Sequence, residues 1–316
     1  MKSEEQFLEL IDQYFPRDHE VLKLGRGDDC AVIAGSKDIC VSSDIFLEDV
    51  HFRRDYFSAE DIGYKALAVN ISDIAGMGAK PVAFTMDLMA PTDLDDDFWN
   101  GFFKSMSMLA RQNDMALAGG DLSKSDKLGV SITIFGVAGG SGTFLTRGGC
   151  EPGDTLFTVG DLGLARAGFM TLEAIGDKGS EVFPAAVRAH LRPKPKVLSG
   201  TLLNAAGIRG LMDVSDGLAR DLPRFLGPDM GADLTIPTSD LNGNVLAFAL
   251  GVGADPIEEA ILGGEDYALL GAASPDDMDK VSSVPGITVI GTVTDNPGII
   301  VNGTPFETPG FDHFDE

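Results

Sequence analysis

Residues 58–81 carry the clearest helical pattern in the chain. Apolar side chains recur there at the three- and four-residue spacing of one helix face: Tyr64, Leu67, Ile71 and Ile74. Alanines and Val69 fill most of the remaining circumference, which is typical of a helix buried on nearly all sides. Ser58 followed by Asp61 predicts a capping box at the start. Gly76, Gly78 and Pro81 predict the end.

Asp73 does not fit this pattern. It lies one turn after Asn70, near the C-terminal end of the predicted helix, where the helix dipole disfavours negative charge. Mostly apolar positions surround it, so an ionised carboxylate needs a positive partner. We therefore expect a cation close to Asp73.

Strand and helix patterns alternate along the rest of the chain, which predicts an α/β or α+β fold. In the first half the predicted strands are 30–33, 38–42, 82–89, 115–118 and 128–139, with a helix at 98–113. A Gly-rich segment, 139–154, predicts a domain junction. Beyond it we expect strands at 155–159, 211–214 and 288–294, and helices at 165–175, 182–190, 198–206, 218–226 and 256–262.

Composition narrows the class of protein. The length of 316 residues predicts two domains, and the net charge of −25 disfavours nucleic acid and anionic membranes as partners. The acidity alone is equally well explained by solubility or by a salty habitat. No apolar run approaches the ~20 residues that span a bilayer, and the acidic N-terminus is unlike a signal peptide. Three scattered cysteines favour a reducing cytoplasm.

Acidic residues follow one recurring pattern. They stand where short apolar strands are predicted to end, often beside Gly: Asp28 and Asp29, Asp44, Asp121, Asp213 and Asp216, and Glu265 and Asp266. Singly, each is explained by a turn or a helix cap. As a set they predict oxygen ligands for Mg²⁺ or Mn²⁺, with hydroxyls from Ser42 and Ser43. The sequence has no zinc, EF-hand, P-loop or dinucleotide-binding motif.

Eight ordered motifs give the chain a family resemblance. They are GDDCAVI (27–33), SSD (42–44), YKALAVNISDIAGMGAKP (64–81), GGD (119–121), TRGGCEPGD (146–154), DVSDG (213–217), GGEDYALL (263–270) and GFDHF (310–314). In this order they resemble the thiamine-monophosphate kinases, a branch of the ATP-binding superfamily of aminoimidazole ribonucleotide synthetase. No Cys precedes Cys30 and the chain ends on Glu316, unlike the selenophosphate synthetase and hydrogenase-maturation branches.

The resemblance implies a two-domain fold. Residues 1–140 are expected to form an ATP- and metal-binding domain whose mixed sheet pairs across a homodimer. Residues 141–316 are expected to form an α/β domain that completes the nucleotide and substrate site, with ATP in the cleft between the domains. The implied activity is that of a phosphotransferase with a phosphate acceptor. It is the ATP- and Mg²⁺-dependent, direct in-line phosphorylation of thiamine monophosphate to thiamine diphosphate.

The resemblance also implies roles for individual residues. The implied ligands of several magnesium ions are Asp29, Ser42, Ser43, Asp44, Asp73, Asp121, Asp213 and Asp216, of which Asp73 and Asp213 are expected to matter most. Gly120, Asp121, Arg147 and Ser215 are expected to contact the nucleotide, and His51, Glu265 and Phe311 the thiamine moiety. The family often has Tyr or Trp where Phe311 stands, so the stacking face is kept and a hydrogen bond is lost.

Elementary chemistry agrees with that implied reaction. The acceptor is a phosphate monoester whose second pKa is about 6, so no general base is assigned. The difficulty is to bring two anionic phosphates together, and bound magnesium ions can offset that repulsion. Two alternatives stay open: another ATP-dependent synthetase of the superfamily, acting on a purine precursor or other small molecule, and a non-catalytic acidic metal-binding protein.

Overall fold

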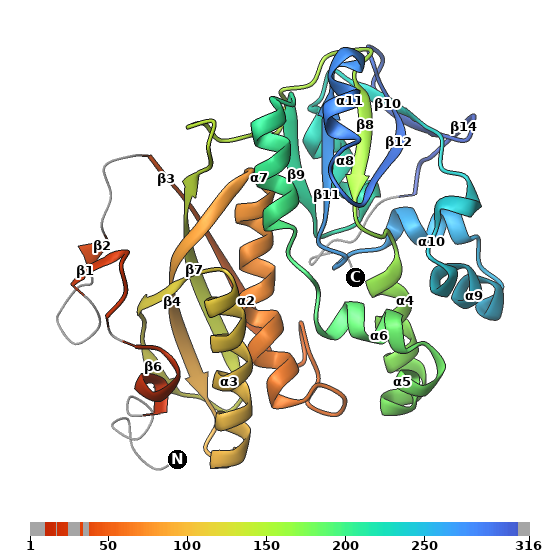
Figure 1. The fold of residues 1–316 in the computed structure, drawn as a ribbon. Helices are drawn as coiled ribbons and strands as arrows, with labels where there is room; N and C mark the ends of the chain where they lie inside the picture. The colour runs from red at the N-terminus through yellow and green to blue at the C-terminus, as the bar shows by residue number, and fades with distance from the viewer. Residues whose placement is uncertain (1–9, 17, 25–31, 34–37, 309–316) are drawn as a thin grey trace. The chain divides into compact units, whose positions relative to one another are not determined.

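The computed structural model describes residues 10–16, 18–24, 32–33 and 38–308. The chain divides into two compact units (Figure 1). The first comprises residues 1–74 and 80–138, and the second comprises residues 75–79 and 139–316. The last residues of the long helix and the turn after it therefore group with the second unit.

A mixed sheet forms the first unit. Its strand order in the described part is β3-β7-β4-β5, with β6 also paired to β4. The bounds are β3 Ile39–Leu47, β4 Ala79–Ala90, β5 Ala116–Gly119, β6 Leu122–Lys124 and β7 Gly129–Ala138. β3 and β7 pair antiparallel, whereas β4 pairs parallel to β5 and to β6. A separate antiparallel pair joins β1 (Leu22–Leu24) and β2 (Val32–Ile33).

Helix α2, Ala59–Gly76, confirms the prediction for residues 58–81. The Ser58 Oγ accepts from the Asp61 N–H at 3.1 Å, and the Ser58 N–H donates to the Asp61 carboxylate at 3.3 Å. These two bonds are the predicted capping box. All residues from 65 to 72 are buried, as expected of an inner helix. The prediction that Pro81 helps to end the helix is wrong, because β4 has already begun at Ala79.

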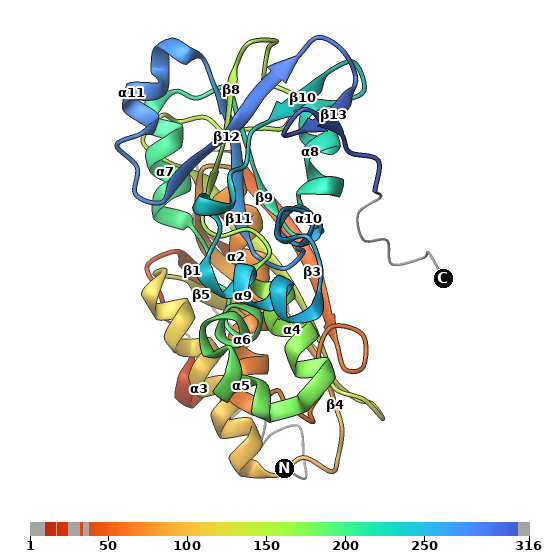
Figure 2. The same cartoon turned by 90° about the vertical axis from the view of Figure 1, so that its right-hand side faces the viewer.

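Helices α2 and α3 lie side by side on one face of this sheet (Figures 1 and 2). A Cβ on Gly63 of α2 would come within 2.2 Å of the Phe102 carbonyl oxygen of α3, so glycine permits their close approach. Asp95 is the N-cap of helix α3, Asp96–Gln112, and its side chain accepts from the Phe98 N–H at 2.8 Å. The sheet's other face carries exposed apolar side chains on β3.

The second unit is built on a longer sheet. Among the described residues its strand order is β14-β13-β10-β12-β8-β11-β9, and only β10–β13 is a parallel pair. The bounds are β8 Thr155–Val159, β9 Gly210–Val214, β10 Gly231–Leu234, β11 Ala268–Ala273, β12 Ile287–Thr294, β13 Gly298–Val301 and β14 Thr304–Pro305. The predicted strands 155–159 and 211–214 are confirmed to within one residue.

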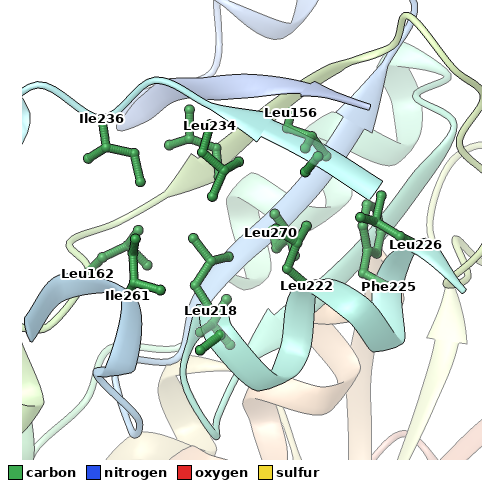
Figure 3. Packing of buried hydrophobic residues seen from close by; sticks show 14 of the residues in the cluster. Leu156, Leu162, Leu218, Leu222, Phe225, Leu226, Leu234, Ile236, Ile261 and Leu270 are labelled. Carbon is green, nitrogen blue, oxygen red and sulfur yellow. The ribbon is translucent and has the colours of Figure 1, made fainter. Parts of the chain in front are cut away.

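Helices pack on both faces of that sheet. On one face, α8 (Leu218–Leu226) and α10 (Pro256–Leu262) cover leucines of β8 and β11 in one buried cluster, shown in Figure 3. On the other face, α7 (Val197–Ala206) and α11 (Met278–Val281) cover Phe157, Leu211 and Leu269. Alternate residues of β9 therefore face opposite helical layers, as the period of a strand requires.

A small helical group completes the second unit. It contains α4 (Leu164–Ile175), α5 (Gly179–Val182), α6 (Pro184–Leu191) and α9 (Gly243–Val252). Side chains of α4, α6 and α9 share a buried apolar cluster that includes Leu164, Val245 and Phe248. In the described part of the chain, no helix has the length and apolar character needed to cross a membrane.

Candidate functional site

Strand β3 and the end of α2 bring three predicted metal ligands together. Ser42 and Asp44 are two residues apart on β3, so their side chains emerge on the same face. The Ser42 hydroxyl donates to Oδ2 of Asp73 at 2.5 Å. Asp44 also interacts with Asp73 through a side-chain hydrogen bond and through charge. The carboxylate that stood out in the sequence of α2 thus lies against a second carboxylate.

The environment of Asp44 is unfavourable for two negative charges. Burial, together with the charge of Asp73 and the hydrogen bond to it, raises the pKa of Asp44 to about 7. The two groups share one proton more easily than they both ionise. A divalent cation bound between them would remove that penalty, so this pair fits a hard metal ion.

The prediction that a strand ends before Asp44 is wrong. Strand β3 continues to Leu47 and pairs with β7 over its whole length, so Asp44 stands in the middle of a strand. Within the described part of the chain, β3 pairs only with β7, and its Ser42 and Asp44 side chains contact Asp73 of α2. The pairing of Asp44 with Ile132 in this ladder fixes its backbone.

Ser43 points to the opposite face of β3. Its hydroxyl donates to the Ile132 carbonyl at 3.1 Å and lies 3.1 Å from the hydroxyl of Thr133. The structure therefore does not bring the Ser43 hydroxyl to the Asp44–Asp73 pair. The part of Ser43 in metal binding stays a prediction.

Gly120 and Asp121 form the turn between β5 and β6. Gly120 has φ +150°, and a Cβ there would come within 1.9 Å of the Met86 carbonyl oxygen. Only glycine fits this approach. The Asp121 carbonyl accepts from the Leu88 N–H at 2.9 Å, and the side chain of Asp121 is exposed.

His51 lies in the turn that follows β3. Its Nδ1 accepts from the Leu47 N–H at 3.0 Å, and its ring lies 5.9 Å from the ring of Phe46. Since Nδ1 accepts, Nε2 carries the proton of the neutral ring. The local contacts thus fix both the orientation and the tautomer of His51.

In the second unit, the predicted site residues Asp213, Ser215 and Asp216 lie at the end of β9 and in the turn that follows it. Asp213 is the fourth residue of β9 and is 5% exposed. Ser215 and Asp216 follow the strand, and their N–H groups both donate to Oδ2 of Asp221 at 2.9 Å. Asp221, 1% exposed, thereby holds the turn in shape, and burial raises its pKa. Asp221 carries no signal of its own in the sequence, although it follows the DVSDG motif by four residues.

Two arginines of α8 neutralise Asp216. Arg224 lies 2.7 Å from its Oδ2 and Arg220 lies 3.6 Å from the same atom. Asp216 therefore already has cationic partners. A metal ion at Asp216 would have to displace or share these ion pairs.

Glu265 stands at the turn that leads into β11. Its backbone has φ +63°, and its N–H donates to the Ser215 carbonyl at 2.7 Å, which ties this turn to the turn after β9. Its Oε2 lies 2.9 Å from Nδ1 of His190, a residue of α6 that is 2% exposed. His190 is not recognisable from the sequence, because a single His in a helix belongs to no motif.

Asp266, the next residue, caps helix α4 from a distance. Its carboxyl oxygens accept from the Gly163 N–H at 2.5 Å and from the Ala165 N–H at 2.7 Å. Burial raises the pKa of Asp266 to about 8, although these two backbone donors lower it. Burial lowers the pKa of Lys196, which lies near Asp266 and Asp161.

The remaining predicted site residues are less constrained. Arg147 is exposed in the segment that precedes β8. Asp28, Asp29 and Phe311 lie outside the described residues. Within the described ranges, no group of three or more His, Cys, Asp or Glu side chains is already arranged as a metal site.

Comparisons with known proteins place both halves of the chain. Residues 27–138 match the family "AIR synthase related protein, N-terminal domain", and residues 151–303 match "AIR synthase related protein, C-terminal domain". The chain is 34% identical over 285 residues to the thiamine-monophosphate kinase of Bacillus subtilis (strain 168). That alignment covers 86% of this chain and 84% of the relative.

Solved structures are similar over nearly the whole length. The thiamine-monophosphate kinase of Stenotrophomonas maltophilia K279a is 29% identical, with a TM-score of 0.81, over 96% of this chain and 97% of that chain. A second structure, described as AaThiL complexed with AMPPCP and TMP, is 29% identical, with a TM-score of 0.79, over 98% of this chain and 97% of that chain. The predicted two-domain fold is confirmed, and the chain belongs to the thiamine-monophosphate kinase family.

Proposed function

We propose that this protein transfers the γ-phosphate of ATP directly to thiamine monophosphate, giving thiamine diphosphate and ADP. The observation that carries the proposal is the Asp44–Asp73 pair in a chain of this family. Two carboxylates that compete for one proton are suited to a divalent cation, and nucleotide phosphates are commonly bound through such cations. The relative with AMPPCP and TMP supports the substrate assignment.

Magnesium fits the residues of the first unit. Asp44 and Asp73 would supply carboxylate oxygens, Ser42 would supply a hydroxyl, and Asp121 would add an exposed carboxylate. Asp29 is proposed as a further ligand. When bound, Mg²⁺ supplies positive charge that offsets the repulsion between two phosphates.

The protein's own groups would hold the reactants in line. We assign the buried Asp213 to the metal ligands and Ser215, Gly120 and Arg147 to nucleotide contacts. Asp221 fixes the backbone of the Ser215 turn, and α8 carries Arg220 and Arg224 close by. Because the acceptor phosphate is already largely deprotonated near neutral pH, the protein would lower the activation barrier mainly by positioning the reactants and by compensating their charge.

We also propose a homodimer formed through the sheet of the first unit. On the face of β3 opposite Asp44, Ile39, Val41 and Ile45 are 41%, 62% and 56% exposed. Apolar side chains in a row on an antiparallel edge strand favour association with another sheet. A second copy of this chain is the occupant that the family resemblance implies.

A cytoplasmic location is the remaining proposal. Cys40 and Cys150, the described cysteines, are both free thiols, which suits a reducing compartment.

The test is a product assay. Purified protein should convert ATP and thiamine monophosphate to ADP and thiamine diphosphate in the presence of Mg²⁺, and EDTA should abolish the reaction. A matched panel with unphosphorylated thiamine and aminoimidazole-type precursors separates this activity from that of a related synthetase. Failure to form thiamine diphosphate, with ADP released on another acceptor, would reject the proposal.

A further inference from the structure

His190 is a buried polar side chain that the proposed phosphoryl transfer does not yet use. It is 2% exposed, and it comes from the last turn of α6. Its Nδ1 lies 2.9 Å from Oε2 of Glu265, and its ring lies 5.4 Å from the ring of Phe169 on α4. The imidazole of His190 therefore lies between helix α4 and the turn that carries Glu265.

The backbone of Glu265 is held independently of its side chain. The Glu265 N–H donates to the Ser215 carbonyl, and the Tyr267 N–H donates to the Val214 carbonyl. Both residues have positive φ, of 63° and 49°, which is a strained conformation for residues other than glycine. Such an outlier on both sides of Asp266 marks a turn whose shape is fixed by the surrounding structure.

The side chain of Glu265 has a more open environment. It is 32% exposed, whereas its partner His190 is almost fully enclosed. An ionised carboxylate accepts hydrogen bonds and cannot donate, so the proton of the 2.9 Å contact belongs to Nδ1 of His190. One oxygen of Glu265 is thus tied to the buried ring.

We propose that His190 is a positioning residue, whose Nδ1–H orients the Glu265 carboxylate toward the cationic ring of the acceptor. This rests on the proposed function, because the thiazolium ring of thiamine monophosphate supplies the positive charge that Glu265 would face. The hydrogen bond removes rotamer freedom from Glu265 before the acceptor binds. His190 would thereby act on acceptor affinity without touching the acceptor.

The tautomer can be measured without any assay of activity. Long-range ¹H–¹⁵N spectra of the full chain distinguish Nδ1–H from Nε2–H, and the sequence has four histidines to assign. We expect His190 in the Nδ1–H form in wild type and a changed Nδ1 shift in Glu265→Gln. A signal of the Nε2–H tautomer, or one that Glu265→Gln leaves unmoved, would overturn the pair.

Kinetics test what the pair does. His190→Asn keeps a donor near the position of Nδ1, whereas His190→Leu fills the space without one. We expect His190→Leu to raise the KM for thiamine monophosphate about tenfold, with kcat and the KM for ATP changed less than about threefold. His190→Asn should restore most of the affinity. Phe169→Leu, which alters the same packing and keeps the donor, is the matched control.

A double-mutant cycle separates positioning from packing. If His190 acts through Glu265, His190→Leu should add little to the loss already caused by Glu265→Gln. Additive effects, an equal loss in His190→Asn, or a fall in kcat alone would contradict the proposal. A wild-type protein that forms no thiamine diphosphate would instead reject the proposed function, and the assignment of Glu265 to the acceptor with it. The tautomer measurement would still decide whether His190 and Glu265 form a pair.

Discussion

A single aspartate near the end of a buried helix is the residue on which the proposed metal site depends. Asp73 accepts a hydrogen bond from the Ser42 hydroxyl, and burial together with the charge of Asp73 raises the pKa of Asp44 to about 7. Without a bound cation such a pair lowers the free energy of unfolding, because two negative charges lie close together in a partly buried place. Functional groups are often destabilising in this sense.

Asp73→Asn should therefore stabilise the metal-free protein and inactivate it. The pKa of Asp44 is higher in the folded protein than in the unfolded chain. Protonated Asp44 therefore stabilises the fold at low pH, and this stabilisation is lost as the pH rises through about 7. In EDTA, the melting temperature of wild type should fall between pH 5 and 8 and that of Asp73→Asn should fall less. At pH 8 with Mg²⁺ the variant should lose at least ~100-fold in kcat, the size expected for loss of a charge-stabilising group.

Asp87→Asn is the matched control for that experiment, since Asp87 is an exposed carboxylate on β4 of the same unit. It should change neither the pH dependence nor the activity. Near-normal turnover in Asp73→Asn would remove Asp73 from the metal ligands.

Asp266 gives a pH dependence that is independent of metal. Its folded-state pKa of about 8 exceeds the usual value for Asp, so its stabilising contribution is present below pH 4 and is lost as pH rises toward 8. Asp266→Asn keeps an oxygen that can accept from the N-terminus of α4 and cannot ionise. The unfolding free energy of Asp266→Asn should thus fall less than that of wild type between pH 5 and 8, measured by urea titration. Asp279→Asn, at an exposed carboxylate, should follow wild type; a parallel fall in Asp266→Asn would contradict the burial argument.

Sequence patterns identified some of these residues and missed others for a physical reason. Asp73 was detectable because a charge in an apolar helix breaks a local pattern. Asp221 and His190 were not, because each acts through a partner that is separated from it in the chain or across a turn. Polar side chains on ordinary helices reveal a role only when the fold supplies their partners.

At the scale of elements, the start of α2 is where sequence and structure agree most closely. The reciprocal bonds between Ser58 and Asp61 follow from local sequence alone, so they could be predicted. The register of β3 could not, because the strand extends to Leu47 only through its pairing with β7. Because of that pairing, Asp44 lies in a strand, whereas the sequence pattern placed it after the end of one.

Ser58→Ala should lower the unfolding free energy by about 1 kcal/mol, the usual effect of losing an N-cap. The lost bonds are those to the Asp61 N–H and from the Ser58 hydroxyl to the Asp61 carboxylate. Urea denaturation followed by circular dichroism measures the change. Lys104→Ala, on the exposed side of α3, is the control and should stay within about 0.5 kcal/mol of wild type. An equal loss in both variants would show that the cap contributes nothing specific.

At the scale of the molecule, the two units each have their own sheet and their own buried core. The Gly-rich segment at 139–154 predicts a junction, and the longer part of the second unit runs from Gly139 onward. What the sequence did not predict is that residues 75–79, at the end of α2, group with the second unit. Gly76 explains this locally, because a Cβ there would come within 2.8 Å of the Asp213 backbone nitrogen.

The exposed face of β3 leads to the prediction at this scale. Val41 is 62% exposed in the middle of a row of apolar side chains, and the proposed homodimer would bury it. Val41→Glu would place a charge in that interface, which is costly without a partner. In analytical ultracentrifugation we expect wild type at twice the chain mass of 33.3 kDa and Val41→Glu at the chain mass itself.

The control is Val289→Glu, which introduces the same charge at an apolar residue of β12 that is 49% exposed in the second unit. It should sediment like wild type, because the proposed interface involves only the first unit's sheet. Val41 points away from Ser42 and Asp44, so a monomeric Val41→Glu protein should still be stabilised by Mg²⁺ at pH 8. A wild-type protein that sediments as a monomer at micromolar concentration would reject the dimer and leave the metal pair to be judged by its own variants.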